Sequence, residues 1–134
     1  MEEKKLKHNG YGKKILIVDD DPVTLMMLEK ILLSEGYWVA QAMNGRDALY
    51  IADDFLPNVI VLDIMMPVMD GTITLKNLEA NPRTRNIPVL FLTSLISKKE
   101  ELKKSIKNRT VLAKPIDRDT LLQEIAKCIE KEQG

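Results

Sequence analysis

Residues 57–71 read Pro-Asn-Val-Ile-Val-Leu-Asp-Ile-Met-Met-Pro-Val-Met-Asp-Gly. The run from Val59 to Leu62 is apolar at every position and too short for a helix, which is typical of a strand buried on both faces of a parallel sheet. Asp63 follows this run directly. Past the next turn, Asp70 is expected to cap a helix that begins at Gly71. The stretch therefore predicts a buried strand, an acid at its carboxyl end and a helix that returns along the sheet.

The same pattern recurs along the chain. Other apolar runs that predict strands lie at Ile15–Val18, Tyr37–Ala42, Val89–Leu92 and Val111–Ala113. Segments with the length and periodicity of helices lie at Pro22–Ser34, Arg46–Phe55, Gly71–Glu79, Lys98–Ile106 and Asp117–Glu130. Alternation of strand and helix implies a parallel sheet with helices on both faces. We therefore expect an α/β fold, a flavodoxin-like (βα)5 three-layer sandwich with strand order 2-1-3-4-5 and a site where that order reverses.

Composition narrows the possible chemistry. The chain has 134 residues, with 20 basic and 20 acidic side chains and a formal net charge of zero. This length fits one domain, which we place at residues 13–134 after a flexible tail at residues 1–12. The absence of net charge argues against direct nucleic-acid binding. Cys128 is the only cysteine and His8, in the tail, the only histidine, so neither a disulfide within the chain nor a histidine-based core site is available.

No stretch approaches the roughly 18 apolar residues of a membrane span. The charged start of the chain is not followed by the apolar segment of a secretory signal. We therefore expect a cytoplasmic protein without a membrane partner.

Polar side chains follow the predicted strands, and carboxyl ends of parallel strands are where ligands bind. The residues in question are Asp19, Asp20, Asp63, Thr93 and Lys114. Acids brought together repel one another unless one is protonated or a cation lies between them, and carboxylate oxygens suit a hard ion such as Mg²⁺. A lysine and a hydroxyl at the same point suit a phosphoryl group. Asp63 is the best candidate for a carboxylate nucleophile.

The chain resembles the receiver domains of two-component response regulators, the chemotaxis-regulator-like superfamily. The segments that carry the resemblance are Ile15–Pro22, Asp63–Gly71, Phe91–Thr93 and Lys114–Pro115, in the order of the family. The resemblance implies that Asp63 is the phosphoacceptor. It also implies a Mg²⁺ or Mn²⁺ ion bound directly by Asp20, Asp63 and the backbone carbonyl of Met65, with Asp19 acting through water.

By the same resemblance, Thr93 and Lys114 contact the phosphoryl group, and the bond between Lys114 and Pro115 is cis. A histidine kinase or a phosphotransfer protein is the implied donor in a phosphorelay. The implied output is a downstream protein, or a second copy in a homodimer, bound on the face of the fourth helix, fifth strand and fifth helix. Such a domain catalyses only its own phosphotransfer and dephosphorylation, so it is not expected to be an enzyme in the usual sense.

Three positions depart from the family pattern. Ser94 follows Thr93 where the family usually has alanine, which affects access to the phosphoryl group. Val111 stands three residues before Lys114, where the family often has an aromatic switch residue, and a valine cannot make the same rotation. The stretch Lys103–Thr110 is basic. From Lys98 to Arg118 there are eight basic and three acidic residues, which indicates either a solvated helix face or a partner surface.

Two other functions stay open from the sequence. One is a binding module with a receiver fold that does not depend on phosphorylation, which the substitution at Val111 favours. The other is a metal-dependent phosphatase with Asp63 as its nucleophile. The short predicted loops offer no cap over a substrate, which disfavours the phosphatase.

Overall fold

The structure is a computed structural model that describes residues 12–94, 106 and 109–133. Its five strands form one parallel sheet with the order β2-β1-β3-β4-β5. The strands are β1 (Lys14–Val18), β2 (Trp38–Ala42), β3 (Val59–Asp63), β4 (Val89–Thr93) and β5 (Val111–Ala113). This order confirms the predicted flavodoxin-like sheet. Asp63 and Thr93 are the last residues of β3 and β4, so each of these strands ends one residue later than predicted.

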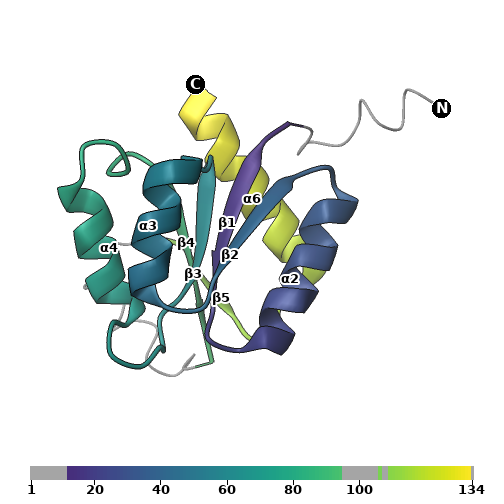
Figure 1. Ribbon diagram of the computed structural model, residues 1–134. Coiled ribbons are helices and arrows are strands. Elements are labelled where there is room, and N and C mark those ends of the chain that lie inside the picture. Colours follow the sequence, from purple (N-terminus) through teal and green to yellow (C-terminus); the bar gives the residue numbers. More distant parts are fainter. Residues whose placement is uncertain (1–11, 95–105, 107–108, 134) are drawn as a thin grey trace.

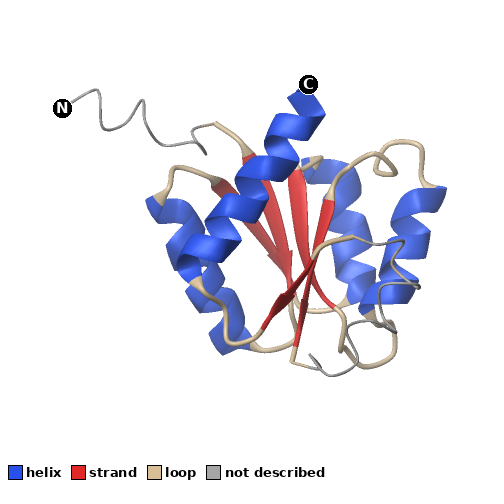
Figure 2. Cartoon of the chain, turned by 180° about the vertical axis from the view of Figure 1, so that it is seen from behind, coloured by secondary structure: helices blue, strands red, loops and turns tan. Residues whose placement is uncertain are grey.

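Helices cover both faces of the sheet, so the domain has three layers (Figure 1). The helices within the described residues are α2 (Pro22–Ser34), α3 (Gly45–Phe55), α4 (Gly71–Ala80) and α6 (Arg118–Gln133). Two of them, α3 and α4, pack on one face, and α2 and α6 pack on the other (Figure 2). Among the described helices, none is long and apolar enough to span a membrane.

Two predictions fall on parts of the chain that are not described. The predicted tail at residues 1–12 lies outside the described residues except for Gly12. The predicted helix Lys98–Ile106 lies outside them except for Ile106, whose side chain is fully buried against the α3 and α4 face. The other predicted helices are present, with ends that differ by up to three residues, as is usual for helix termini.

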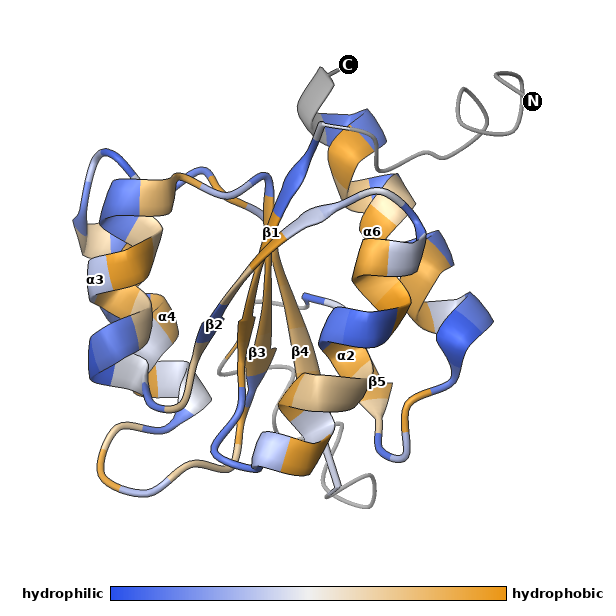
Figure 3. Ribbon diagram, turned by 45° about the vertical axis from the view of Figure 1, so that its right-hand side comes forward, coloured by the Kyte–Doolittle hydropathy of each residue, from blue (hydrophilic) through white to orange (hydrophobic). Residues whose placement is uncertain are grey.

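Successive strand residues face opposite layers, and both layers are apolar. In β1, Ile15 and Ile17 belong to the cluster under α2 and α6, whereas Leu16 and Val18 belong to the cluster under α3 and α4. All four side chains have no exposed surface. Figure 3 shows the central strands in apolar colours between helices that carry both polar and apolar residues. Burial on both faces explains why the strand sequences are continuously apolar rather than alternating.

Side-chain caps fix where the helices begin beside the carboxyl ends of the strands. The Asp21 carboxylate accepts a hydrogen bond from the backbone N–H of Val23 at 3.0 Å, and Asp70 accepts from Thr72 at 2.9 Å. These contacts confirm the predicted cap at Asp70 and show that Asp21 caps α2, so the third acid after β1 has a structural role. The acids Asp19 and Asp20 remain available for other chemistry.

Candidate functional site

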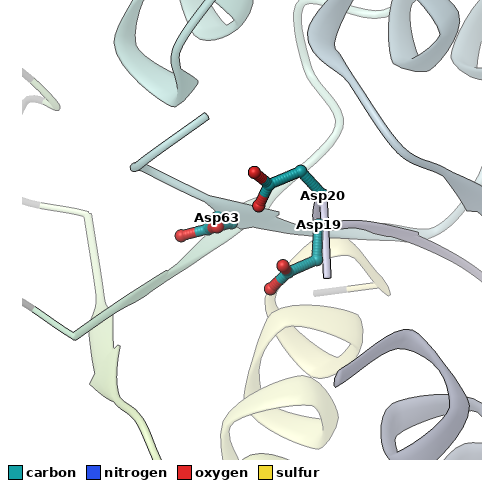
Figure 4. Close-up of side chains that lie close together, drawn as sticks. All are labelled: Asp19, Asp20 and Asp63. Carbon is teal, nitrogen blue, oxygen red and sulfur yellow. The ribbon is translucent and has the colours of Figure 1, made fainter. Parts of the chain in front are cut away.

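Three carboxylates converge at the carboxyl ends of the neighbouring strands β1 and β3. Asp19 and Asp20 follow Val18, which is paired in register with Leu62, the residue before Asp63. One carboxylate oxygen of each acid lies within 4.8 Å of the other two. Figure 4 shows the three side chains close together. The chain order reverses between these two strands, so the acids stand at the switch point of the sheet, where α/β folds bind ligands.

The three acids differ in burial. Because two of them are buried, their negative charges destabilise the folded domain unless a positive charge lies nearby. Asp19 has no exposed surface and Asp63 is 2% exposed, whereas Asp20 is exposed. Burial, together with the charge of Asp19, raises the pKa of Asp63 to about 6, against the opposing effects of Lys114 and the Met65 backbone. The raised pKa means that burial and the negative charge of Asp19 outweigh the stabilising effect of the nearby positive charge.

Lys114 supplies the nearest positive charge. It follows β5, where its backbone N–H donates to the Thr93 carbonyl at 2.9 Å. Its Nζ atom lies 2.7 Å from Oδ2 of Asp19 and 3.4 Å from Oδ2 of Asp63. Burial by itself would lower the pKa of Lys114, but the contacts with both acids raise it above its ordinary value, so the ammonium is charged. The bond to Pro115 is cis, as the resemblance implied.

Thr93 and Met65 complete the surroundings of Asp63. Thr93 is fully buried at the end of β4, between the strands that carry Asp63 and precede Lys114. The backbone N–H of Met65 donates to Oδ1 of Asp63 at 3.1 Å. A Cβ atom on Gly71 would lie 2.8 Å from the backbone oxygen of Asp63, so only glycine lets α4 begin this close to the strand end.

Two of the positions that depart from the family pattern, Ser94 and Val111, lie at different depths. Ser94 and Pro115 are exposed at the same edge of the sheet as the acids. Val111 is 4% exposed, is paired with Phe91 on β4 and belongs to the apolar cluster under α3 and α4. Its side chain is therefore part of the core.

Exposed apolar side chains at this edge of the sheet form an apolar rim, which was not predicted from the sequence. Its members are exposed side chains from the first turns of α2, from the segment after β2 and from the segment after β3, namely Val23, Met26, Met27, Met43, Met65 and Val68. The signal was present as four methionines close to strand ends, but periodicity alone assigns such residues to a core. Exposed apolar side chains grouped around a polar site are typical of a surface that another protein covers.

The donor set fits a hard divalent cation. Carboxylate oxygens are the ligands that Mg²⁺ prefers, and the spacing of the three oxygens allows one ion to be shared. A cation here would also offset the repulsion that raises the pKa of Asp63.

Comparisons with known proteins agree with this geometry. The family model "Response regulator receiver domain" matches residues 15–126. Among similar proteins, Protein PilH of Pseudomonas aeruginosa is 34% identical over 113 residues, which cover 84% of this chain and 93% of PilH. Response regulator PleD of Caulobacter vibrioides is 40% identical over 105 residues, which cover 78% of this chain and only 23% of PleD.

One similar structure holds a metal ion. It is the receiver domain of the sensor histidine kinase PA1611 from Pseudomonas aeruginosa, solved with a magnesium ion coordinated in its active-site cleft. It is 29% identical to this chain with a TM-score of 0.78, covering 89% of this chain and 98% of the other. This similarity and the acidic cluster together indicate divalent-metal binding. The chain belongs to the response regulator receiver domain family of two-component systems.

Proposed function

We propose that Asp63 accepts a phosphoryl group from the phosphohistidine of a histidine kinase or phosphotransfer protein, and that the modified domain binds a downstream partner. The observation that carries this proposal is the position of Asp63. Its carboxylate is almost fully buried, within 4.8 Å of two other acids and 3.4 Å from a lysine ammonium. We assign the receiver domain to residues 13–134, with residues 1–12 as its tail, and its activity to the cytoplasm.

In this proposal Asp20, Asp63 and the backbone carbonyl of Met65 hold a Mg²⁺ or Mn²⁺ ion, and Asp19 holds it through water. When bound, the ion supplies positive charge that offsets the negative charge of the acids and of the phosphoryl oxygens. The exposure of Asp20 supports this assignment because it leaves the cluster open to solvent on one side.

The transfer itself is a substitution at phosphorus. An oxygen of Asp63 forms the new O–P bond while the N–P bond of the phosphohistidine breaks, and the imidazole leaves and takes up a proton. Lys114 pairs with one phosphoryl oxygen, and the Thr93 hydroxyl donates to another. Thr93 ends β4 and Lys114 directly follows β5, and both strands lie on the same side of β3, which supports their joint role.

The apolar rim supports a donor that is a protein rather than a free metabolite. A small phosphodonor needs only the polar pocket, whereas a protein that presents a phosphohistidine must also cover the surface around it. Turnover is limited to loading and losing this one group, so the role is signalling.

For the output, we propose the face formed by the fourth helix of the family, β5 and α6. This fourth helix corresponds to the predicted helix Lys98–Ile106, of which only Ile106 is described. The support therefore comes from the edge strand β5, which precedes Lys114, and from α6. Val111 is buried in the core, and we infer that the signal reaches this face without the aromatic rotation common in the family. A second copy of the chain is one candidate occupant of the face.

The test is incubation with acetyl phosphate and Mg²⁺ followed by intact-mass measurement. We expect a gain of about 80 Da, one HPO₃ group, in the wild type and none in Asp63→Asn. A matched control is Asp54→Asn, an exposed acid on α3, which should gain the same mass as the wild type. A gain in Asp63→Asn equal to that of the wild type would overturn the assignment.

The two alternatives give different results. A binding module that does not depend on phosphorylation binds its partner equally well as wild type and as Asp63→Asn. A metal-dependent phosphatase releases many equivalents of phosphate from small phosphoesters, whereas the proposed receiver releases phosphate only from its own Asp63.

A further inference from the structure

A hollow lies at the opposite end of the sheet from the three acids. Its volume is about 530 Å³, and it is lined by residues 85–90, Arg109, Thr110, Cys128 and Lys131. Residues 85–90 lead into and begin β4, Arg109 and Thr110 precede β5, and the last two belong to the C-terminal part of α6. In Figure 1 this is the end of the domain where the C-terminus is marked.

The hollow is independent of the acidic pocket. The acids lie at the carboxyl ends of the strands, and the hollow lies where β4 and β5 begin. β4 has five residues, which separate the two sites by about 16 Å along the sheet. The two sites share none of the residues that line them.

The charged side chains among the described lining residues of the hollow are all basic. Arg85, Arg109 and Lys131 line it, and none of its described lining residues is acidic. Arg85 and Lys131 are exposed, and within the described part of the chain neither has an ion-pair partner within 4.0 Å. Asn86 and Thr110 add neutral hydrogen-bonding groups, and both are exposed. A ligand with negative charge is therefore favoured.

Arg109 is held in place before any ligand arrives. Its Nη2 atom lies 3.0 Å from Oε2 of Glu79 on α4, and its Nη1 atom donates to the Ile106 carbonyl at 3.2 Å. Side-chain exposure of the pair is only 26% and 23%. Because a guanidinium has five N–H donors, these two bonds leave donors for a ligand, and the ordering cost of the side chain is already met.

The remaining described residues of the lining are mainly apolar, and none of them is aromatic. Of the apolar residues that line the hollow, Ile87 and Pro88 are partly buried, and Val89 and Leu90 are buried. A nucleobase would find no ring on which to stack. Apolar side chains next to cations from three separate elements fit an extended ligand that carries both acids and an apolar group.

From this charge complementarity we infer that the hollow is a docking site for an acidic peptide segment of a partner protein, one with an apolar side chain between its carboxylates. The partner binds at the amino ends of β4 and β5, so it does not occupy the acidic pocket. The same domain can then hold this segment while Asp63 exchanges its phosphoryl group.

The probe is the capped peptide Glu-Glu-Leu-Glu-Glu, titrated into the ¹⁵N-labelled chain at low ionic strength and followed by amide chemical shifts. We expect shifts at residues 85–90, 109–110 and 128–131, and weaker binding as salt is added. The charge-reversal variant R85E/K131E should bind about tenfold more weakly, which corresponds to about 1.4 kcal/mol. The control K127E reverses a charge on the same helix outside the hollow and should bind as the wild type does.

Three results would overturn the inference: equal shifts with Lys-Lys-Leu-Lys-Lys, equal binding by R85E/K131E, or the same shifts with inorganic phosphate at the same affinity. Phosphate acting alone would show a simple anion site and not a peptide site. Both substituted side chains are exposed, so the variant should fold. Its mass gain with acetyl phosphate should match the wild type, which separates this test from that of the proposed function.

Discussion

The ammonium of Lys114 lies closer to Asp19 than to Asp63, at 2.7 Å against 3.4 Å. Asp19 has no exposed surface, whereas the Lys114 side chain is 21% exposed. Lys114 is therefore the counter-charge of a carboxylate that has no access to solvent. A cation or a phosphoryl group bound among the acids would change the charge around the Lys114–Asp19 pair. The pair therefore links the folding stability of the domain to ligand binding.

Removing this counter-charge should destabilise the metal-free domain. We expect Lys114→Met to lower the free energy of unfolding by about 3 kcal/mol, because it leaves the buried Asp19 carboxylate without its counter-charge. Urea denaturation in EDTA measures the effect. Lys127→Met removes an exposed ion pair instead and should cost less than about 0.5 kcal/mol. Equal losses in the two variants would show that the Lys114 pair has no special role.

Replacing Asp63 should stabilise the metal-free domain. The pKa of Asp63 is raised to about 6 by burial and by Asp19. A carboxyl group whose pKa is higher in the folded state favours folding below its unfolded pKa and loses this contribution as the pH rises through about 6. At neutral pH, Asp63→Asn should therefore raise the unfolding free energy by about 1 to 3 kcal/mol. The gain should vanish at about pH 4, and the exposed control Asp54→Asn should give no comparable gain at neutral pH.

Binding of Mg²⁺ should weaken in acid for the same reason. A proton on Asp63 competes with the cation, so affinity should fall as the pH is lowered through about 6. Calorimetric titrations at about pH 5 and about pH 7.5 measure this difference. An affinity that stays constant over this range would mean that Asp63 is not a ligand.

Trp38 should not report on metal binding. It is 65% exposed and lies at the start of β2, paired with Lys14 at the start of β1. Asp19 follows the other end of β1, about 16 Å along the strand. The fluorescence of Trp38 should therefore stay constant when Mg²⁺ is added. A marked quenching would place the ion elsewhere or require a change that spreads through the whole sheet.

Val68 adopts a backbone conformation that β-branched residues rarely tolerate. Its φ is 67°, its side chain is fully exposed, and the N–H of Met69 donates to the Pro67 carbonyl across it at 2.7 Å, which makes a γ-turn. Val68→Asn should stabilise the domain by about 1 kcal/mol, because asparagine accepts positive φ more readily. The control Val23→Asn, at an exposed helical position, should not stabilise it. Thermal denaturation compares the two variants.

Much of the fold followed from local pattern. Continuous apolar runs predicted the strands because parallel strands are buried on both faces, and β1 and β3 have that burial. Asp70 was predicted as a cap because a short acid before a helix accepts from its first N–H groups, as it does from Thr72. The convergence of Asp19, Asp20 and Asp63 also followed, since parallel neighbouring strands end at the same edge.

Residue type and spacing were enough to predict the strand and helix order and to place the acids, Thr93 and Lys114 at strand ends. Two relationships are visible only in the folded chain: Lys114 lies closer to Asp19 than to Asp63, and Arg85, Arg109 and Lys131 share one hollow. Those relationships join residues from 22 to 95 positions apart in the chain. Their distances are set by how strands and helices pack on one another, and no local sequence pattern encodes that packing.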